Sequence, residues 1–325
     1  MKKSNLRDLY DQQLLSLEAY RFSLRHFDGS KPDSRISFCL LVIGTLLTLS
    51  GIIFFFAYNW ANLTAPIKFL LVESLLGIAV VIPLFKGFHT GAGRAGLCAA
   101  TVLIGVFLAV FGQIYQIGAD RYELFGGWAL LSLPWVILGN MQGLWLFWIG
   151  LLNLTSILYY IQVIGLPSYM AYSGIFLFLT ILNGSFLVAR EMIADKGFKW
   201  LHSSWPRDLL LVVNSIIAAI PPHLWIVQWF QQKDPMLGIA ALEFFGLIIL
   251  AIWFYMRVGH FTGVAIPVLA FSLTLVNCTG YLISESLNDV IFTTFLITII
   301  CLIVFSSASY FLKQINQLFN QRRHA

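Results

Sequence analysis

Residues 54–68, FFFAYNWANLTAPIK, interrupt a long apolar run with Asn59, Trp60 and Asn62. The apolar pattern resumes around Pro66 and then contains Glu73, five residues after Lys68. Two apolar runs joined by a short polar turn are typical of two membrane-spanning helices with a hairpin between them. The stretch therefore predicts a membrane protein. It also raises the question whether these polar residues only make a turn or also form one wall of a site.

The composition of the 325-residue chain supports this interpretation. It is 59% hydrophobic and 11% charged, with a mean hydropathy of +0.82, whereas soluble chains carry about 25% charged residues. The first apolar run follows a polar segment of 35 residues, which is too long for the head of a cleaved signal peptide, so we expect that run to be a retained anchor. The four cysteines lie in apolar runs without metal-site spacing, so neither a disulfide framework nor a zinc site is predicted.

Runs long enough to cross a bilayer, about 20 apolar residues for a core of about 30 Å, occur ten times. We expect an all-α polytopic membrane protein of about ten transmembrane helices. Prolines inside several runs predict kinks, and the short fourth run, with Pro134, is expected to be tilted or broken. The expected spans are residues 36–58, 67–85, 97–117, 122–138, 144–164, 172–190, 209–229, 237–255, 264–282 and 290–311.

The basic residues predict the orientation of these spans. With ten spans both termini share one side, and seventeen of the twenty Lys and Arg residues fall on that side. The other side has only Lys68, Arg121 and Lys233. Because loops rich in Lys and Arg stay in the cytoplasm, both termini are predicted to be cytoplasmic. The net charge of +5 follows from this distribution and does not favour a nucleic-acid partner.

The chain divides by composition into four parts. Residues 1–35 form a cytoplasmic helical segment, residues 36–190 a six-span region, residues 191–208 an interfacial cytoplasmic loop, and residues 209–325 a four-span region with a short tail. Within the first part, an apolar face at helical spacing runs through residues 6–24. This face fits a helix on the membrane surface, packed on the protein's own cytoplasmic ends, and it also fits a docking helix for a cytoplasmic protein partner.

Two acids, Glu73 and Glu243, lie inside apolar runs. A charge at the bilayer centre costs about 2.5–3.5 kcal/mol even on insertion scales, so each acid requires a partner, water or a proton. Either glutamate fits a proton acceptor in a transport path, and either fits a neutral group that bonds across helices. Each follows a proline at the start of its span, Pro66 and Pro235, so the two halves are also candidates for a parallel repeat.

A second polar group occurs at the outer end of the third span. Gln113, Gln116 and Asp120 are spaced i, i+3 and i+7, so they share one stripe if the helix continues that far. Amides in this position line a polar cavity or bond neighbouring helices together. The predicted outward-facing polar cavity comprises Asn59, Trp60, Glu73, Gln113, Gln116 and Asp120, with Glu243 as a further candidate in the second half.

The segments GIIFFFAYNW (51–60), FGQIYQIGAD (111–120) and WALLSLPWVI (128–137) resemble an uncharacterised family of bacterial multi-spanning membrane proteins, domain of unknown function 2157. The resemblance covers roughly residues 8–150. It implies a short cytoplasmic helix, a first span that ends in Asn-Trp, and a location in the bacterial inner membrane. An acidic residue often follows Asn-Trp in that family, whereas Ala61 and Asn62 follow here.

Sequence motifs for catalysis are missing from the chain. It has no HExxH helix, P-loop, GxGxxG turn or DxD pair, so we expect no enzyme activity, no cofactor and no metal site. The leading hypothesis is transport or permeation of a small solute, ion or lipid headgroup. The alternative is a non-catalytic assembly or sensing protein that binds a partner through its cytoplasmic helix, and an intramembrane enzyme ranks third.

Overall fold

The structure is a computed structural model of the chain. The chain divides into two compact units, residues 1–68 and 69–325. The described residues are 60–115, 118, 120–164, 169–194, 203–228, 235–287 and 289–324, with 9–12, 14–20 and the single positions 23, 43, 47, 51, 54 and 58 nearer the N-terminus.

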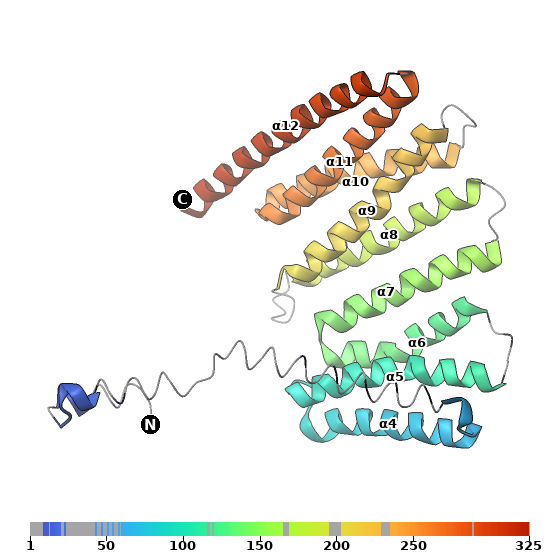
Figure 1. Cartoon of the computed structure of the whole chain (residues 1–325), viewed down its shortest axis with the longest axis vertical. Helices are drawn as coiled ribbons and strands as arrows, with labels where there is room; N and C mark the ends of the chain where they lie inside the picture. Colours follow the sequence, from blue (N-terminus) through green and yellow to red (C-terminus); the bar gives the residue numbers. More distant parts are fainter. Residues whose placement is uncertain are drawn as a thin grey trace. The chain divides into compact units, whose positions relative to one another are not determined.

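Helices make up most of the described part of the chain, which contains no strand (Figure 1). The elements in order are η1 (Trp60–Asn62), α4 (Ala65–Lys86), α5 (Gly91–Tyr115), α6 (Arg121–Gly139), α7 (Gln142–Tyr159), the π-helical turn η2 (Tyr160–Ile164), α8 (Tyr169–Ala194), α9 (Trp205–Gln228), α10 (Pro235–Val258), α11 (Phe261–Ser286) and α12 (Val290–His324).

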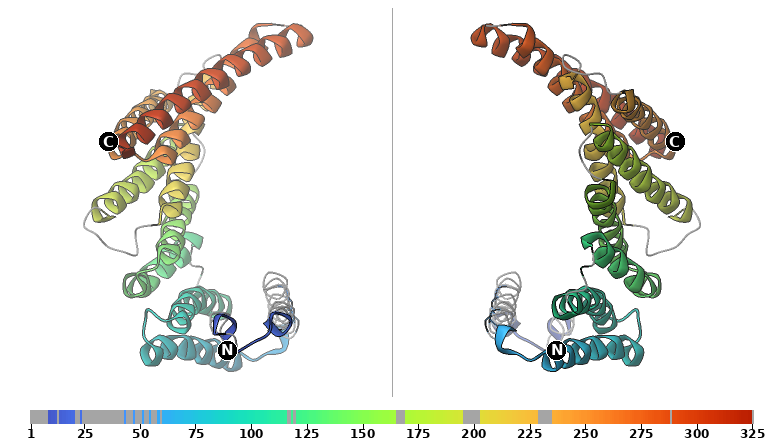
Figure 2. Two further views of the ribbon diagram at one scale, coloured as in Figure 1. Left: turned by 90° about the vertical axis from the view of Figure 1, so that its left-hand side faces the viewer. Right: turned by 90° about the vertical axis from the view of Figure 1, so that its right-hand side faces the viewer.

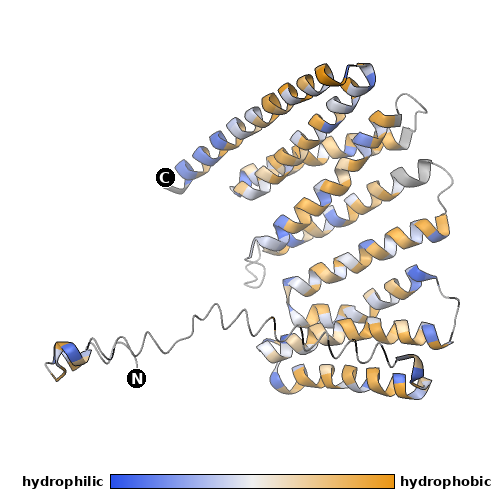
Figure 3. Cartoon of the chain, in the orientation of Figure 1, coloured by the Kyte–Doolittle hydropathy of each residue, from blue (hydrophilic) through white to orange (hydrophobic). Residues whose placement is uncertain are grey.

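In the described part of the chain, nine helices are long and apolar enough to cross a membrane. They correspond to the second to tenth predicted spans, and Figure 3 shows apolar residues over most of their lengths. The first predicted span, residues 36–58, falls outside the described residues except at isolated positions. The all-α polytopic fold is therefore confirmed, and its physical reason is that an apolar helix of some 20 residues satisfies its own backbone hydrogen bonds in lipid.

Three boundaries differ from the sequence-based expectation. α6 is continuous from Arg121 to Gly139, so Pro134 does not break it. The predicted loop 191–208 is shorter, because α8 continues through Ala194 and α9 begins at Trp205. Pro206 is suited to the first turn of α9, because backbone N–H groups in a first turn have no partner within the helix and the missing N–H of proline costs nothing there. The last helix, α12, has 35 residues, about 52 Å at 1.5 Å per residue, and so is longer than the apolar run alone.

Side chains of tryptophan hold successive helices together. The indole N–H of Trp128 on α6 donates to the carbonyl oxygen of Thr101 on α5 at 2.7 Å. The indole N–H of Trp148 on α7 donates to the carbonyl oxygen of Ala129 on α6 at 2.8 Å. Gly105 makes room for the first ring, since a Cβ there would lie 2.4 Å from the indole of Trp128. α6 is thus fixed to α5, and α7 to α6, by an indole ring and its hydrogen bond.

The helices α8 to α11 form a denser group than those before them. α9 packs against α8, α10 and α11, and α8 also packs against α10, as the views in Figures 1 and 2 agree. Fully buried side chains from this group include Phe244 on α10 and Val264 on α11, both 0% exposed. The group places three helix faces around one space, which contains the candidate site.

Candidate functional site

The residues predicted for an outward-facing cavity are only partly described. Trp60 lies in η1, where the ammonium of Lys68 is 5.3 Å from its ring centroid, a cation–π contact within the first unit. Asn59 and Gln116 lie outside the described residues. Glu73 is exposed on α4 and Gln113 is exposed on α5. A shared cavity of these residues therefore stays a prediction.

The expected polar stripe does not continue along one helix. α5 ends at Tyr115, and Gly118 has a φ of +60°, a left-handed conformation that does not continue an α-helix. Asp120 is exposed at the N-cap position of α6. The condition for one shared stripe, a helix that continues to Asp120, is not met, because Gly118 is left-handed and Asp120 precedes α6. Glu243, the further candidate, is half-buried on α10 beside the fully buried Phe244.

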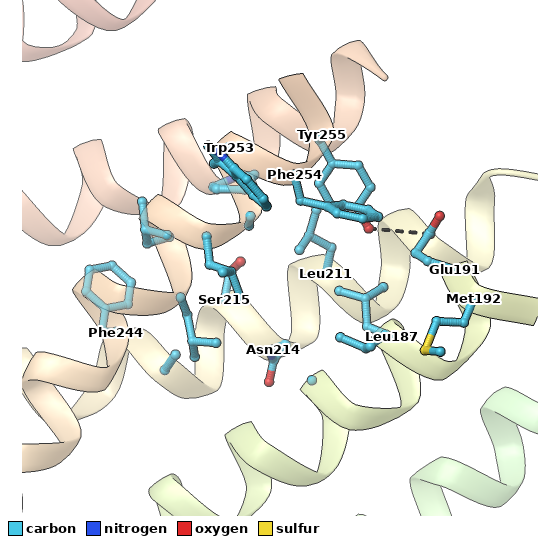
Figure 4. Close-up of a pocket in the computed structure, with 18 residues that line it drawn as sticks. Leu187, Glu191, Met192, Leu211, Asn214, Ser215, Phe244, Trp253, Phe254 and Tyr255 are labelled. Atoms are coloured by element: carbon cyan, nitrogen blue, oxygen red, sulfur yellow. Dashed lines mark hydrogen bonds between the residues drawn. The ribbon is translucent and has the colours of Figure 1, made fainter. Parts of the chain in front are cut away.

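A groove of about 250 Å³ lies between α8, α9 and α10 (Figure 4). Its walls are almost entirely apolar, with Leu187 from α8, Leu211 from α9 and Phe244 from α10 as examples. Three polar residues interrupt the walls, and they are Glu191, Asn214 and Ser215. We call this space the lateral groove.

The lateral groove opens sideways. Val188 and Met192 on α8 and Leu250 and Trp253 on α10 all line it, and each is at least half exposed. Large apolar side chains with this exposure on membrane-spanning helices face lipid chains rather than water. The groove is therefore continuous with the hydrocarbon of the bilayer along one side.

The groove has a polar end and an apolar end. Glu191 and Tyr255 lie at the polar end, near the C-termini of α8 and α10. Phe244 lies eleven residues before Tyr255 on α10, which is about 16 Å at 1.5 Å per residue. Since the hydrocarbon core is about 30 Å thick, the groove has about the depth of one leaflet.

Asn214 is the deepest strongly polar group in the groove. It is 7% exposed, and its side-chain oxygen is buried without a hydrogen bond to any described residue. Gly184 on α8 faces it, since a Cβ there would lie 3.6 Å from the Asn214 Nδ2 atom. Leaving a buried polar group unpaired costs about 1–3 kcal/mol. The Nδ2 atom of the same amide lies on the side of Gly184, which lines the groove, and can donate to a ligand there.

Charged residues surround the polar end of the groove. The guanidinium of Arg207, on a residue 2% exposed, donates to Asp208 at 2.8 and 2.9 Å and to the hydroxyl of Thr262 at 2.8 Å. It also lies over the ring of Tyr255, 5.6 Å from the centroid. Such a buried cation is tolerated because its donors are used by an acid, a hydroxyl and an aromatic face. We call these four residues the Arg207 cluster.

Glu191 links this cluster to the groove. Its Oε1 atom accepts a hydrogen bond from Arg190 at 2.7 Å and a long one, 3.4 Å, from the hydroxyl of Tyr255. The ring of Tyr255 is held from the other side by Gly263, where a Cβ would lie 2.4 Å from the ring. Glu191 is therefore anchored by an ion pair, while its contact to the tyrosine is weak.

The turn between α10 and α11 shapes the same end. Gly259, with a φ of +80°, ends α10 and donates its N–H to the carbonyl of Tyr255 at 2.9 Å. His260 follows, exposed on one side, and the partial burial of its ring lowers its pKa, with the nearby charge of Arg207 acting in the same direction. Both influences disfavour the protonated imidazole.

A pair of amides lies within the membrane-spanning part of α7 and α8. Asn153 and Asn183 exchange side-chain hydrogen bonds of 3.0 and 2.7 Å, and Asn183 is 1% exposed. Each also donates to a carbonyl of its own helix, 2.7 Å from Ile149 and 2.8 Å from Leu179. This pair is satisfied and joins two helices, in contrast to Asn214.

The groove residues do not stand out in the sequence. Glu191 belongs to the predicted interfacial loop, and Asn214 is one polar residue in the apolar run LLLVVNSIIAAIPP, residues 209–222. The available signal was the presence of single asparagines in three consecutive spans. Their pattern does not reveal which one would remain unpaired, since that depends on contacts with a neighbouring helix.

The comparisons with known proteins concern the other end of the chain. Residues 7–145 match a family described as predicted membrane protein, DUF2157. The resemblance read from the three N-terminal motifs is confirmed over that range. Neither curated proteins nor solved structures gave a match. The lateral groove, which begins at Gly184, lies beyond the matched residues, so its interpretation rests on its own geometry.

Proposed function

We propose that the protein is a non-enzymatic membrane transporter that takes up a lipid, headgroup included, from one leaflet through the lateral groove. The observation that carries this proposal is the groove itself, which is open to the bilayer on one side, apolar along its walls and bordered by charge at one end. Amphiphiles have the same distribution of polarity along their length. A water-soluble solute would find almost no polar partners on these walls.

The polar residues along the groove support movement of a lipid headgroup in addition to binding of an acyl chain. Glu191 and Gly184 are seven residues apart on α8, about 10 Å at 1.5 Å per residue, and Gly184 faces Asn214. A headgroup that leaves the membrane interface at Glu191 therefore meets a second group of polar residues, Asn214 and Ser215, part of the way into the membrane. Polar groups at such depth lower the cost of bringing a headgroup into hydrocarbon.

The orientation in this proposal follows from charge. Arg190, Arg207, Arg257 and Arg322 all belong to the end of the helices where the Arg207 cluster lies. By the positive-inside rule we infer that this end, with the C-terminus, is cytoplasmic, so the groove takes its ligand from the cytoplasmic leaflet of a bacterial inner membrane. The ten spans expected from the sequence then place the N-terminus on the same side.

A lipid translocation assay tests the proposal. Gly184→Leu places a branched side chain inside the groove, because the glycine lines it and a Cβ there meets Asn214 only at 3.6 Å. In proteoliposomes with chain-labelled fluorescent phospholipids, we expect the full-length protein to accelerate exchange between leaflets. We expect Gly184→Leu to slow it about tenfold, equivalent to about 1.4 kcal/mol in the barrier to exchange, because the added side chain occupies the groove.

The matched control is Gly246→Leu on α10, because Gly246 is exposed and a Cβ there meets nothing within 4 Å. It should behave as the unmodified protein. Equal rates for empty liposomes and for all three proteins would overturn the transport proposal. That outcome would favour the alternative, an assembly or sensing protein.

A further inference from the structure

We propose that the polar end of the lateral groove selects phospholipids with a primary-amine headgroup, which bind through their ammonium to Glu191. This inference rests on the proposed function, since it requires a lipid in the groove, and it names the class of that lipid. The occupant is a glycerophospholipid of the ethanolamine type.

Charge complementarity points to an ammonium. Among the described residues that line the groove, Glu191 alone carries a formal charge. Its side chain is 12% exposed, so the carboxylate is largely removed from water and charge-assisted hydrogen bonds to it are correspondingly strong. The groove therefore presents a carboxylate that is paired with Arg190 on one oxygen, and an ammonium group complements this carboxylate.

Glu191 retains capacity for another donor. Both of its contacts with described residues use the Oε1 atom, and the contact with the hydroxyl of Tyr255 is 3.4 Å long, outside the usual range for a hydroxyl hydrogen bond. A carboxylate offers about four lone-pair sites on two oxygens. A primary ammonium has three N–H donors and can use Oε2, whereas a quaternary trimethylammonium has none.

The neighbouring charges fit the rest of the headgroup. Arg190 lies 2.7 Å from Glu191 through its Nη1 atom, so a cationic residue stands beside the anionic one at the same end of α8. A zwitterionic headgroup carries a phosphate next to its ammonium and is attracted by such an adjacent pair. The arrangement favours a headgroup with both charges over one with phosphate alone.

Asn214, the deeper polar residue, lies at a depth that fits the ester groups of the same lipid. Asn214 is about 10 Å further along the groove than Glu191, by the rise of α8 between Glu191 and Gly184. Its Nδ2 atom lies on the side of Gly184, which lines the groove, and an amide NH₂ group can donate to an ester carbonyl. The acyl chain then follows the apolar walls toward Phe244 (Figure 4).

The test uses headgroups that differ by one methyl group at a time. The full-length protein is reconstituted in phosphatidylglycerol vesicles containing equal small amounts of phosphatidylethanolamine, its mono- and dimethyl derivatives, and phosphatidylcholine. After mild detergent extraction, mass spectrometry measures the lipids retained by the protein. We expect retention to fall with each methyl group. The overall preference for ethanolamine over choline should be about tenfold, as a hydrogen bond to a charged group allows.

A pair of variants assigns the preference to its residue. Glu191→Gln should reduce the ratio of ethanolamine to choline lipid to about one while lipid is still retained. The matched control, Glu285→Gln, removes an exposed carboxylate from α11 and should keep the ratio of the unmodified protein. Size-exclusion chromatography identifies any misfolded variant, and the methylation series on the unmodified protein remains decisive in that case.

The outcomes separate this inference from the function on which it rests. Retained lipid with no dependence on headgroup methylation would overturn the amine selection and leave the groove as a lipid site. A preference that survives Glu191→Gln would also overturn the assignment. If the protein retains no lipid above the level of the vesicle mixture, the proposed lipid transport fails together with the inference.

Discussion

Buried polar residues of two kinds occur in the α8–α11 group, and they differ in how their hydrogen bonds are satisfied. Arg207 is 2% exposed and donates to both Asp208 and Thr262. Asn214 is 7% exposed, and its oxygen has no described partner. A satisfied network rigidifies the surrounding helices, whereas an unpaired buried group costs free energy. In Asn214 the group that a ligand in the groove can reach is the Nδ2 atom, which lies on the side of Gly184.

The lowered pKa of His260 predicts how the stability of the protein depends on pH. Partial burial and the charge of Arg207 lower its pKa in the folded protein below the ordinary value of 6.5. The unfolded chain therefore binds the proton more readily, so this contribution to stability is present above about pH 6.5 and is lost as the pH falls through the folded pKa. Glu191 and Asp208 act in the opposite direction but are weaker influences.

The measurement is the thermal midpoint in detergent between about pH 7.5 and about pH 5, across the ordinary pKa of histidine. The unmodified protein should lose stability toward the acidic end. His260→Asn should flatten the part of the curve near pH 6, because asparagine does not titrate. A variant whose curve follows that of the unmodified protein throughout would show that His260 does not contribute.

The sequence predicts the individual helices well, but it does not predict which helices contact each other. The apolar runs predicted the second to tenth spans, because one apolar helix can satisfy its own backbone hydrogen bonds in lipid. Most bounds agree within about four residues, but α5 begins six residues earlier and α12 ends thirteen residues later than predicted. The lateral groove was not predicted, since it depends on α8 meeting both α9 and α10. The periodicity of Asn214 along α9 says which face it occupies but not which neighbour covers that face.

Glycines in α5 provide a test of how helices are packed. A Cβ at Gly105 would lie 2.4 Å from the ring of Trp128, whereas a Cβ at Gly112, seven residues later, would meet nothing within 4 Å. Gly105→Ala must therefore displace a ring whose N–H bonds to Thr101. We expect it to cost about 1–3 kcal/mol, as overpacking does.

The comparison is made by denaturant titration of both variants in the same micelles. Gly112→Ala is the control, and it should be neutral or slightly stabilising, because alanine is the better helix former. Equal stability of the two variants would mean that α5 and α6 are not packed through Trp128 as described.

At the scale of the whole molecule, the matched family and the candidate site occupy different regions. The family match ends at residue 145, and the groove is lined by residues 184–267. The second unit therefore combines a family-like set of helices, α4 to α6, with a denser group, α8 to α11, that has its own ligand-sized space. The predicted polar residues of the first region, Glu73 and Gln113, are exposed, and their shared cavity stays a prediction.

The most direct test of the central claim is photocrosslinking with a phosphatidylethanolamine that carries a photoreactive group on its acyl chain. The probe is added on ice to inside-out and to right-side-out membrane vesicles, and labelled peptides are identified by mass spectrometry. We predict labelling concentrated in residues 184–192 and 247–255 when the probe enters the cytoplasmic leaflet, and its reduction by Gly184→Leu. Labelling spread evenly over the lipid-facing helices, or equal from both leaflets and unchanged in that variant, would contradict a lipid site in the lateral groove.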